Sequence, residues 1–464
     1  MRLIIIVKYE NLFFEFGTIG SIIVNTKSSR LVVFSAFWLL AIVSVTACGG
    51  GVSPGSPEVA TPVVSEALTH TPTPLPSPTP VVVSGTVSIW HSWDEPYVPA
   101  LLRRIFEFNK LYPNVYFDVQ YVPALDLQSA YEQAALEGHS PTLLIGQAEW
   151  GPALYDKGLV ADLASLVPAD LLNTLNRAAV GTGRYRDAII SVPVDIRGVV
   201  LYRNQSIIPI APSTFDELVS LAKEATRGQR LGAVLDRSFF FSGAHLIGLG
   251  GSLMDSEGRP AFNNLKGLEW MNLLQAFSEA GPAEFFTDND FNLFKEGRAG
   301  MIIDGTWNRN ALAEAIGAAN LAIDLWPIHA EGSLSGFVQT ESLFLSSAAL
   351  SEEQMASMKF LQFFLSPESQ AAVAQVGLIP AINGSPVNLA ASQVEVDDPL
   401  IAQAMRALVD GVTYPVVPEM SVYTSQMDIA LKSIFDGGVA PESALKRAEE
   451  AIQVALEKKG TPTP

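Results

Sequence analysis

The sequence predicts an α/β protein in which parallel strands are covered by helices. Residues 86–90 and 115–121 alternate polar and apolar side chains, which is the pattern of a half-buried strand. Between them, residues 101–108 place apolar side chains at helical spacing. A polar helix over about 125–137 and a short apolar strand at 143–145 complete a β-α-β-α-β order. Parallel strands need such crossover helices, so this order predicts a parallel sheet with helices on its faces.

The same alternation of elements continues toward the C-terminus. A helix is predicted after Pro212-Ser213-Thr214, where Asp216 and Glu217 are placed for a capping box. Further predicted elements are strands at 189–194 and 199–202 and helices at 351–365, 399–409, 421–435 and 441–456. At roughly 100–200 residues per domain, the chain of 464 residues provides two or three domains.

The composition excludes some classes of partner. Apolar residues make up 48% of the chain, which is enough for a large core. The chain has 29 Lys and Arg residues against 48 Asp and Glu residues, a formal net charge of −19. An acidic surface offers no electrostatic attraction to nucleic acid or to anionic lipid. We therefore expect no nucleic-acid partner, while a cationic ligand stays compatible with the charge.

The N-terminal segment has the features of an export signal. Lys27 and Arg30 precede residues 31–47, which contain no charged side chain and are followed by Cys48. A basic segment followed by an apolar one is typical of a signal peptide, and the end of this one resembles a bacterial lipobox. In that resemblance Ala47 precedes the cleavage site and Cys48 carries the acyl chains. The alternative is an uncleaved membrane helix with an unmodified cysteine, although the segment lies at the short limit for spanning.

The regions around this signal are predicted from composition. Residues 1–47 are predicted to be a signal peptide with an upstream extension, which translation from a start near Val24 would explain. Residues 48–84 are rich in Gly, Ser, Thr and Pro and cannot bury a core, so we expect a lipidated tether on the outer face of the cell membrane. Residues 461–464 repeat the Thr- and Pro-rich composition of the tether, and residues 458–464 are predicted to be a disordered tail.

Seven short segments carry a resemblance to a known family. They are residues 87–95 (VSIWHSWDE), 106–115 (FEFNKLYPNV), 141–150 (PTLLIGQAEW), 191–204 (SVPVDIRGVVLYRN), 294–307 (FKEGRAGMIIDGTW), 360–382 (FLQFFLSPESQAAVAQVGLIPAI) and the loop and helix that begin at 418 (PEM). In this order they resemble family 1 extracellular solute-binding proteins, which include maltose-binding proteins. Residues 335–343 lack the double glycine common in many relatives, so ligand contacts from that strand do not transfer in detail.

The resemblance implies a two-lobed periplasmic-binding-protein-like fold, in which each lobe is a sheet flanked by helices. The implied lobes are residues 85–194 with 328–380, and residues 195–327 with 381–457. Crossovers are implied near 194–197, 326–327 and 378–382, with Asp195, Arg197, Pro327 and Pro380 as hinge residues. The resemblance places the ligand in the cleft between the lobes and implies delivery to the permease of an ABC transporter. We expect a monomer without a cofactor, a metal site or catalytic residues.

Aromatic and acidic residues follow two predicted strands at their carboxyl ends, where open α/β sheets bind ligands. Trp93, Asp94 and Glu95 follow the first strand, and Gln147, Glu149 and Trp150 follow the third. An indole face packs on the C–H face of a sugar ring, and a carboxylate accepts hydrogen bonds from its hydroxyl groups. The alternatives are structural, since Asp94 and Glu149 would also suit helix caps, and Trp90 would suit the core.

Four further candidates lie elsewhere in the sequence. They are His245, Trp307, Glu341 and Tyr423. Trp307 follows a strand and a turn, and it matches the stacking aromatic residue of the family. Glu341 stands alone among small and apolar residues, and Tyr423 lies in the C-terminal ligand loop of the resemblance. A lone histidine is more often structural, which is the alternative for His245. Asp195 and Arg197 would form a hinge ion pair or contact the ligand.

The abundance of aromatic residues in the crevice segments favours a carbohydrate ligand over polyamines, peptides or polyol phosphates. A glycoside hydrolase is one alternative, but it needs two carboxylates facing each other across the cleft, and no spacing in the sequence supports such a pair. A sugar-sensing module that feeds no transporter is another. Residues 288–292 resemble a calcium loop, but Leu293 stands where that loop needs glycine, so Asp290 is predicted to be a helix cap.

Overall fold

The structure is a computed structural model that describes residues 82–94, 96–384 and 396–460, together with three short strands nearer the N-terminus. These strands are β1 (Ile6–Lys8), β2 (Phe14–Phe16) and β3 (Ile22–Val24). The chain divides into two compact units, Glu10–Val82 and the remainder, Met1–Tyr9 with Val83–Pro464. Both lobes described below belong to that remainder. Cys48, Glu95 and most of the predicted signal peptide, tether and tail lie outside the described residues.

The first lobe is built on a six-stranded sheet with the order β1-β5-β4-β6-β17-β9. Its strands after β1 are β4 (Gly85–His91), β5 (Val115–Tyr121), β6 (Leu143–Gln147), β9 (Val192–Pro193) and β17 (Glu341–Leu345). β4 pairs in parallel with β5 and with β6, which confirms the predicted parallel order. β17 lies antiparallel to β6, because this stretch of the chain returns from the second lobe.

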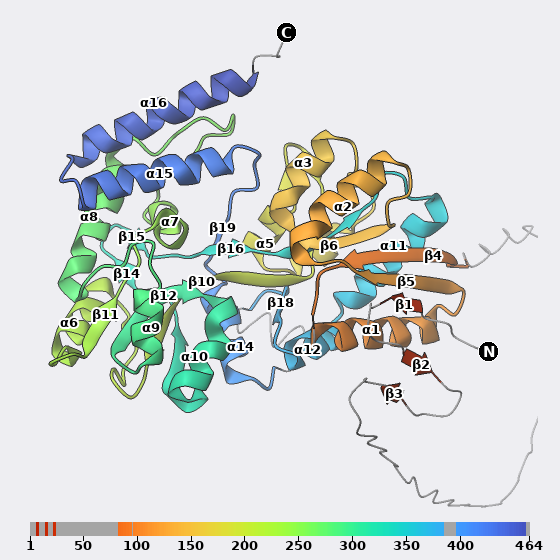
Figure 1. Ribbon diagram of the computed structural model, residues 1–464, viewed down its shortest axis with the longest axis horizontal. Helices are drawn as coiled ribbons and strands as arrows, with labels where there is room; N and C mark the ends of the chain where they lie inside the picture. Colours follow the sequence, from red (N-terminus) through yellow and green to blue (C-terminus); the bar gives the residue numbers. More distant parts are fainter. Residues whose placement is uncertain are drawn as a thin grey trace, which may run out of the picture. The chain divides into compact units, whose positions relative to one another are not determined.

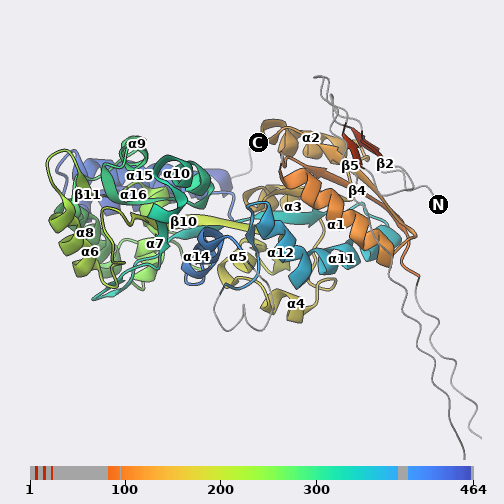
Figure 2. The same cartoon turned by 90° about the horizontal axis from the view of Figure 1, so that it is seen from below.

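Helices cover both faces of this sheet (Figures 1 and 2). One face carries α1 (Tyr97–Leu111), α11 (Ser351–Phe364) and α12 (Pro367–Gln375), and the other carries α2 (Ala124–Leu136) and α3 (Gly151–Asp156). α1 turns Leu101, Ile105 and Phe108 inward at the spacing of one helix face. The ring of Phe108 packs edge-on against Phe117 of β5 and Phe360 of α11, at centroid distances of 5.8 and 5.4 Å. Aromatic packing thus joins the first helix to the sheet and to a helix from the far end of the chain.

The second lobe is built on a seven-stranded sheet with the order β11-β12-β10-β16-β19, in which β13 and β18 also pair with β10. Its strands are β10 (Asp195–Asn204), β11 (Leu231–Val234), β12 (Ala299–Gly305), β13 (Leu321–Asp324), β16 (Phe337–Gln339), β18 (Ile379–Pro380) and β19 (Val412–Thr413). Its principal helices are α6 (Phe215–Ala225), α7 (Phe239–Gly248), α8 (Leu265–Ala280), α9 (Asn289–Lys295), α10 (Arg309–Ile316), α14 (Pro399–Ala407), α15 (Met420–Phe435) and α16 (Pro441–Gly460).

β10 divides its side chains between two cores. Val199 and Leu201 enter the core of the second lobe with Trp270, while Val200 and Tyr202 point to the opposite face. Successive side chains of a strand point to opposite faces, so a strand covered on both sides reads as one continuous apolar run. The core that holds Val200 and Tyr202 extends into the first lobe, and one apolar layer therefore runs beneath the connections between the lobes.

A buried ion pair fixes the far end of β10. The Nε and Nη2 atoms of Arg203 donate to the two carboxylate oxygens of Asp324 on β13, at 2.6 and 3.0 Å. Nη1 of Arg203 donates to the carbonyl oxygen of Ile208 at 2.8 Å. The two charges are thus neutralised in a bidentate geometry that favours Arg over Lys.

Within the described residues, the chain passes between the lobes at three places. These are the junction of β9 with β10, the junction of β16 with β17, and β18. The predicted crossover at residues 326–327 is wrong. Trp326 lies in the second-lobe core, and the hairpin of β14 (Ile328–His329) and β15 (Gly332–Ser333) keeps the chain in that lobe, with the Ile328 amide donating to the Ser213 carbonyl oxygen. Pro327 is therefore not at a crossover, and the first lobe resumes at Glu341, not at residue 328.

Smaller differences concern the bounds of elements. The strand predicted at 189–194 is divided into β8 (Ala188–Ile189) and β9, and α16 extends into the segment predicted as a disordered tail. The start of α6 follows the prediction, since the Glu217 amide donates to Oγ1 of Thr214 and Oε2 of Glu217 accepts from the Ser213 amide. Within the described part of the chain, no helix is both long enough and apolar enough to cross a membrane.

Candidate ligand-binding cleft

A cavity of about 230 Å³ lies where the lobes meet. Its first-lobe walls come from the loop after β4, the start of α1, β17 and the segment after α12, and its second-lobe walls come from β10 and from the turn after β12. The lining residues are Ser92, Trp93, Asp94, Tyr97, Asp195, Ile196, Arg197, Thr306, Trp307, Arg309, Glu341, Gly377, Leu378 and Ile379. A ligand in this cavity would contact both lobes and all the places where the chain crosses between them.

Glu341 is held in place at the floor of the cavity by both lobes. The indole Nε1 of Trp93 donates to Oε2 of Glu341, and Nη2 of Arg197 lies 3.9 Å from Oε1. The backbone amide of Glu341 donates to Oδ1 of Asp195 at 2.9 Å. The carboxylate is thus oriented before a ligand arrives, so a ligand need not pay the entropy of ordering it.

At the floor of the cavity, acidic side chains outnumber basic ones. Burial, and next the charge of Glu341, raise the pKa of Asp195 to about 7. Burial also raises the pKa of Glu149. A 2.6 Å hydrogen bond donated by Nε2 of Gln339 acts in the opposite direction but has the smaller effect. Burial alone would lower the pKa of Arg197, but the surrounding carboxylates outweigh it and raise that pKa. One guanidinium is therefore shared among several carboxylates, which leaves acceptor oxygens for hydroxyl donors.

Trp307 is the aromatic wall of the cavity on the second-lobe side. Its side chain is 44% exposed, which leaves an indole face open to a ligand. Its ring lies against Gly305, where a Cβ would collide with the indole in its present position, so glycine leaves room for this placement of the ring. The turn itself is fixed by Asp304, which accepts from the Gly305 amide at 2.6 Å and from Nδ2 of Asn308 at 2.9 Å. Strand, glycine and capped turn together set the position of the indole.

An aromatic row continues from Trp307 across the second lobe. Phe240 of α7 lies 6.0 Å from Trp307, and Tyr414 lies 5.8 Å from Phe240, as distances between ring centroids. All three rings keep some exposure. Consecutive rings at this spacing form a continuous apolar track that begins at the cavity.

Six of the residues predicted from sequence line the cavity. They are Trp93, Asp94, Asp195, Arg197, Trp307 and Glu341. Glu149 lies just behind the floor of the cavity, where it accepts a hydrogen bond from Gln339. Gln147 is exposed at the end of β6 and is paired in register with Glu341.

Trp150 packs against Gly146 and against the small first-lobe cluster around Tyr131. Trp90 packs in the same cluster, which agrees with the alternative that placed it in the core. Pro380 pairs with Asp195 in the hinge ladder.

Two predicted ligand contacts lie in the second-lobe core instead. His245 is fully buried, accepts a hydrogen bond at Nδ1 from the Ser335 amide, and packs edge-on against Trp326. Burial lowers its pKa to about 3, so it is neutral. Tyr423 is also fully buried, and its hydroxyl donates to the Gly258 carbonyl oxygen at 2.7 Å. Both positions face inward from their helices, which the sequence pattern did not reveal.

Several lining residues were not predicted. Arg309 lies two positions after Trp307, and Tyr97 begins α1, so proximity to predicted residues was the available signal for both. Phe240, which continues the aromatic row beyond the cavity lining, belongs to a run of three phenylalanines that was not predicted to reach the site. Tyr414 lies in a loop without a distinctive pattern, and no sequence signal would have found it.

A second acidic cluster lies in the second lobe outside the cavity lining, and one member, Asp304, fixes the turn that carries Trp307. Asp236, Glu284, Asp290 and Asp304 are all buried. Burial raises the pKa of Asp290 to about 8, with further contributions from Asp236, Asp304 and Glu284. Asp290 is the second residue of α9, and Asp288 occupies the cap position, so the predicted capping role of Asp290 is wrong. Among the described residues, no group of three His, Cys, Asp or Glu side chains has the geometry to hold a metal ion.

Comparisons with known proteins agree with this architecture. A family model for the bacterial extracellular solute-binding proteins matches residues 104–402. The galactooligosaccharide-binding protein of Bacillus subtilis is 25% identical over 348 residues, which are 69% of this chain and 78% of that protein. A maltooligosaccharide ABC transporter solute-binding lipoprotein of Streptococcus pneumoniae is 24% identical over 288 residues, 58% of this chain and 65% of the relative.

A solved structure extends the comparison to the fold. The cyclic alpha-maltosyl-1,6-maltose binding protein of Arthrobacter globiformis is similar to 81% of this chain over its whole length, with a TM-score of 0.70 and 21% identity. This similarity confirms the two-lobed fold class predicted from the sequence. Because the family model spans well over half of the chain, the protein belongs to the bacterial extracellular solute-binding proteins.

Proposed function

We propose that the protein captures a neutral oligosaccharide in the cleft between its lobes and delivers it to the permease of an ABC transporter. The observation that carries the proposal is the half-exposed indole of Trp307, which stands beside a floor of oriented carboxylates. An aromatic face beside hydrogen-bond acceptors matches the two surfaces of a sugar ring, its C–H face and its hydroxyl rim.

The length of the aromatic row favours an oligosaccharide over a single sugar. Phe240 and Tyr414 extend the apolar track beyond the cavity in steps of about 6 Å between ring centroids. Consecutive rings at this spacing suit consecutive rings of a saccharide. The relatives from Bacillus subtilis and Streptococcus pneumoniae, whose names specify oligosaccharides, support the same ligand class.

The lobes would close on the ligand by a hinge motion. Asp195 and Arg197 lie on β10, and Pro380 of β18 pairs with Asp195, so few backbone connections resist rotation there. A ligand that contacts both lobes favours the closed state by its extra contacts in that state. The closed form would be the one recognised by the permease.

A binding protein fits this floor better than a hydrolase does. The Glu341 carboxylate already accepts from Trp93 and neighbours Arg197, and the Asp195 carboxylate accepts from a backbone amide. A glycosidase needs one carboxyl group free to give a proton and a second free to act on the sugar or on water. We therefore expect no release of shorter sugars when maltotetraose is incubated with the protein, and measurable turnover would contradict this proposal.

We further infer that Cys48 anchors the protein to the outer face of the cell membrane. The proposal rests on the apolar segment before this cysteine and on the Pro-rich segment after it. Several acyl chains on one cysteine give stable anchoring, since each buried methylene contributes about 0.8 kcal/mol. Cells fed radioactive palmitate should label the wild-type chain and not a Cys48→Ser variant, and equal absence of label in both would refute the anchor.

A thermal-shift screen tests the ligand class. Maltotetraose and galactooligosaccharides should raise Tm, because a ligand that binds only the native state at about 100 times its Kd adds about 2.7 kcal/mol of stability. Spermidine and glycerol phosphate serve as the cationic and anionic comparisons. A rise in Tm with spermidine alone would replace the carbohydrate proposal with a polyamine.

A further inference from the structure

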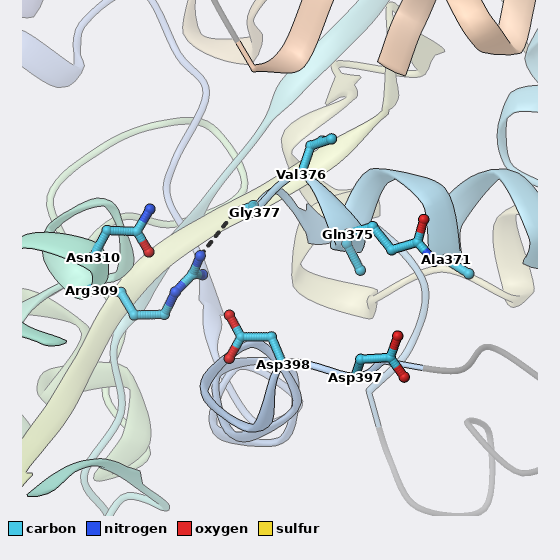
Figure 3. A pocket seen from close by; sticks show the side chains of 9 residues that line it. Arg309, Asn310, Ala371, Gln375, Val376, Gly377, Asp397 and Asp398 are labelled. Atoms are coloured by element: carbon cyan, nitrogen blue, oxygen red, sulfur yellow. Dashed lines mark hydrogen bonds between the residues drawn. The ribbon is translucent and has the colours of Figure 1, made fainter. Parts of the chain in front are cut away.

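A second cavity, of about 330 Å³, adjoins the cleft and is called here the annex. It is lined by Arg309, Asn310, Ala371, Ala374, Gln375, Val376, Gly377, Asp397 and Asp398 (Figure 3). Arg309 and Gly377 line both the annex and the cleft. The annex is at the lower end of the volume range of small-molecule sites, about 300–1,000 Å³.

A hydrogen bond between the lobes joins the two residues that line both cavities. Nη2 of Arg309, at the start of α10 in the second lobe, donates to the carbonyl oxygen of Gly377, after α12 of the first lobe, at 3.0 Å (Figure 3). Arg309 is only 3% exposed, and its Nε has no hydrogen-bond partner among the described residues. A buried N–H without a partner costs about 1–3 kcal/mol, which a ligand acceptor would recover.

The remaining polar groups of the annex determine which ligands it accepts. Asp398 caps α14, accepting from the Leu400 amide at 2.8 Å, and its carboxylate faces the same space as the Arg309 guanidinium (Figure 3). Asp397 adds a second carboxylate, while Asn310 and Gln375 add amides that both donate and accept. The two carboxylates disfavour an anion, while the guanidinium offsets one of the two negative charges. A neutral molecule with many hydroxyl groups satisfies donors and acceptors together.

We propose that the annex is a further saccharide subsite, which takes the sugar ring that follows those held in the cleft. The inference rests on the proposed function, because it extends the same ligand across the boundary at Arg309. The aromatic row from Tyr414 through Phe240 to Trp307 reaches the cleft from one side, and Arg309 lies two residues beyond Trp307. An oligosaccharide that fills the cleft therefore has its next ring beside the annex.

Blocking the annex from each lobe tests the proposal. Gln375→Trp on α12 and Asn310→Trp on α10 change residues that line the annex but not the cleft, and both positions are exposed, so the fold should tolerate them. Gln133→Trp, at an exposed position of α2 that lines neither cavity, is the matched control. Calorimetric titration with maltose and maltotetraose gives the affinity of each variant.

The expected result is a loss of at least tenfold in affinity for maltotetraose in both annex variants, with the affinity for maltose within twofold of wild type. Unchanged affinity for both sugars would show that the annex is not used. An equal loss for both sugars would show that tryptophan at these positions disturbs the cleft or its closure, which also overturns the proposal. If the wild-type protein binds neither sugar, the annex proposal fails for maltooligosaccharides, and the thermal-shift screen with galactooligosaccharides decides separately whether the carbohydrate function stands.

Discussion

Replacing Trp307 with alanine should weaken the binding of maltotetraose at least tenfold while leaving the fold intact. The indole is 44% exposed at the cleft, so its removal opens no cavity in a core. A tenfold loss corresponds to about 1.4 kcal/mol. Aromatic stacking alone contributes about 0.5–1.5 kcal/mol beyond the apolar area that the ring buries, so the two contributions together reach at least this value. Calorimetric titration measures the affinity, and thermal unfolding of the free protein checks the fold.

Two companion variants separate stacking from general effects. Tyr116→Ala removes another exposed aromatic ring, 59% exposed on β5 of the first lobe, and should leave the affinity unchanged. Trp307→Phe keeps a flat ring at the same place and should recover part of the lost affinity. If Trp307→Ala binds maltotetraose as tightly as wild type, the indole does not contact the sugar, and the ligand assignment loses its main support.

The strands and helices that position the cleft could be predicted from local patterns in the sequence. Residues 115–121 alternate strictly, and α1 keeps its apolar residues on one face, so both elements were predicted within a few residues. In each case one face is buried and the other is in water, and this difference leaves a periodic trace in the sequence.

The crossovers were harder to predict, because a strand that is buried on both faces does not alternate polar and apolar residues. β10 is buried on both faces along most of its length, so nothing in its sequence shows where one lobe ends. The second crossover was expected near Pro327 from the family resemblance, and the hairpin of β14 and β15 that follows this residue was not predicted. Pairing of Arg197 with Gln339 in the sheet fixes the true crossover, and such a pairing between distant segments has no local signal.

The candidate site, like the fold, could be predicted where the signal is local and not where contacts come from distant parts of the chain. Trp93 was found because it follows a strand at its carboxyl end, a rule that depends only on local order. Trp307 was found because it follows a strand and a turn and matches the stacking aromatic residue of the family. Tyr423 was misplaced because the helical pattern of its segment does not say which face is covered, and the structure buries it against the Gly258 loop. Tyr414 occupies the aromatic row instead, through contacts with Phe240 and Phe337 that come from distant parts of the chain.

The largest expected effect on stability is that of Asp324→Ala in the second lobe. Both side chains of the Arg203–Asp324 pair are less than a tenth exposed, so removing the carboxylate leaves a guanidinium buried without its counter-charge. Breaking a buried pair in this way costs about 3–5 kcal/mol, whereas an exposed pair contributes about 0–1 kcal/mol. Urea unfolding should therefore show a much lower midpoint for Asp324→Ala than for wild type.

The exposed pair of Arg259 and Asp255 supplies the matched control, because Asp255→Ala removes a carboxylate from an arginine that stays in water. A double variant, Arg203→Met with Asp324→Leu, replaces both charges with apolar side chains and should be more stable than Asp324→Ala alone, since no charge is left buried. If Asp324→Ala and Asp255→Ala lower stability equally, the guanidinium of Arg203 finds water or another partner. In that case the pair does not fix the end of β10, and the strand that carries Arg197 to the cleft is held by its backbone pairing with β12 and β13 and by packing.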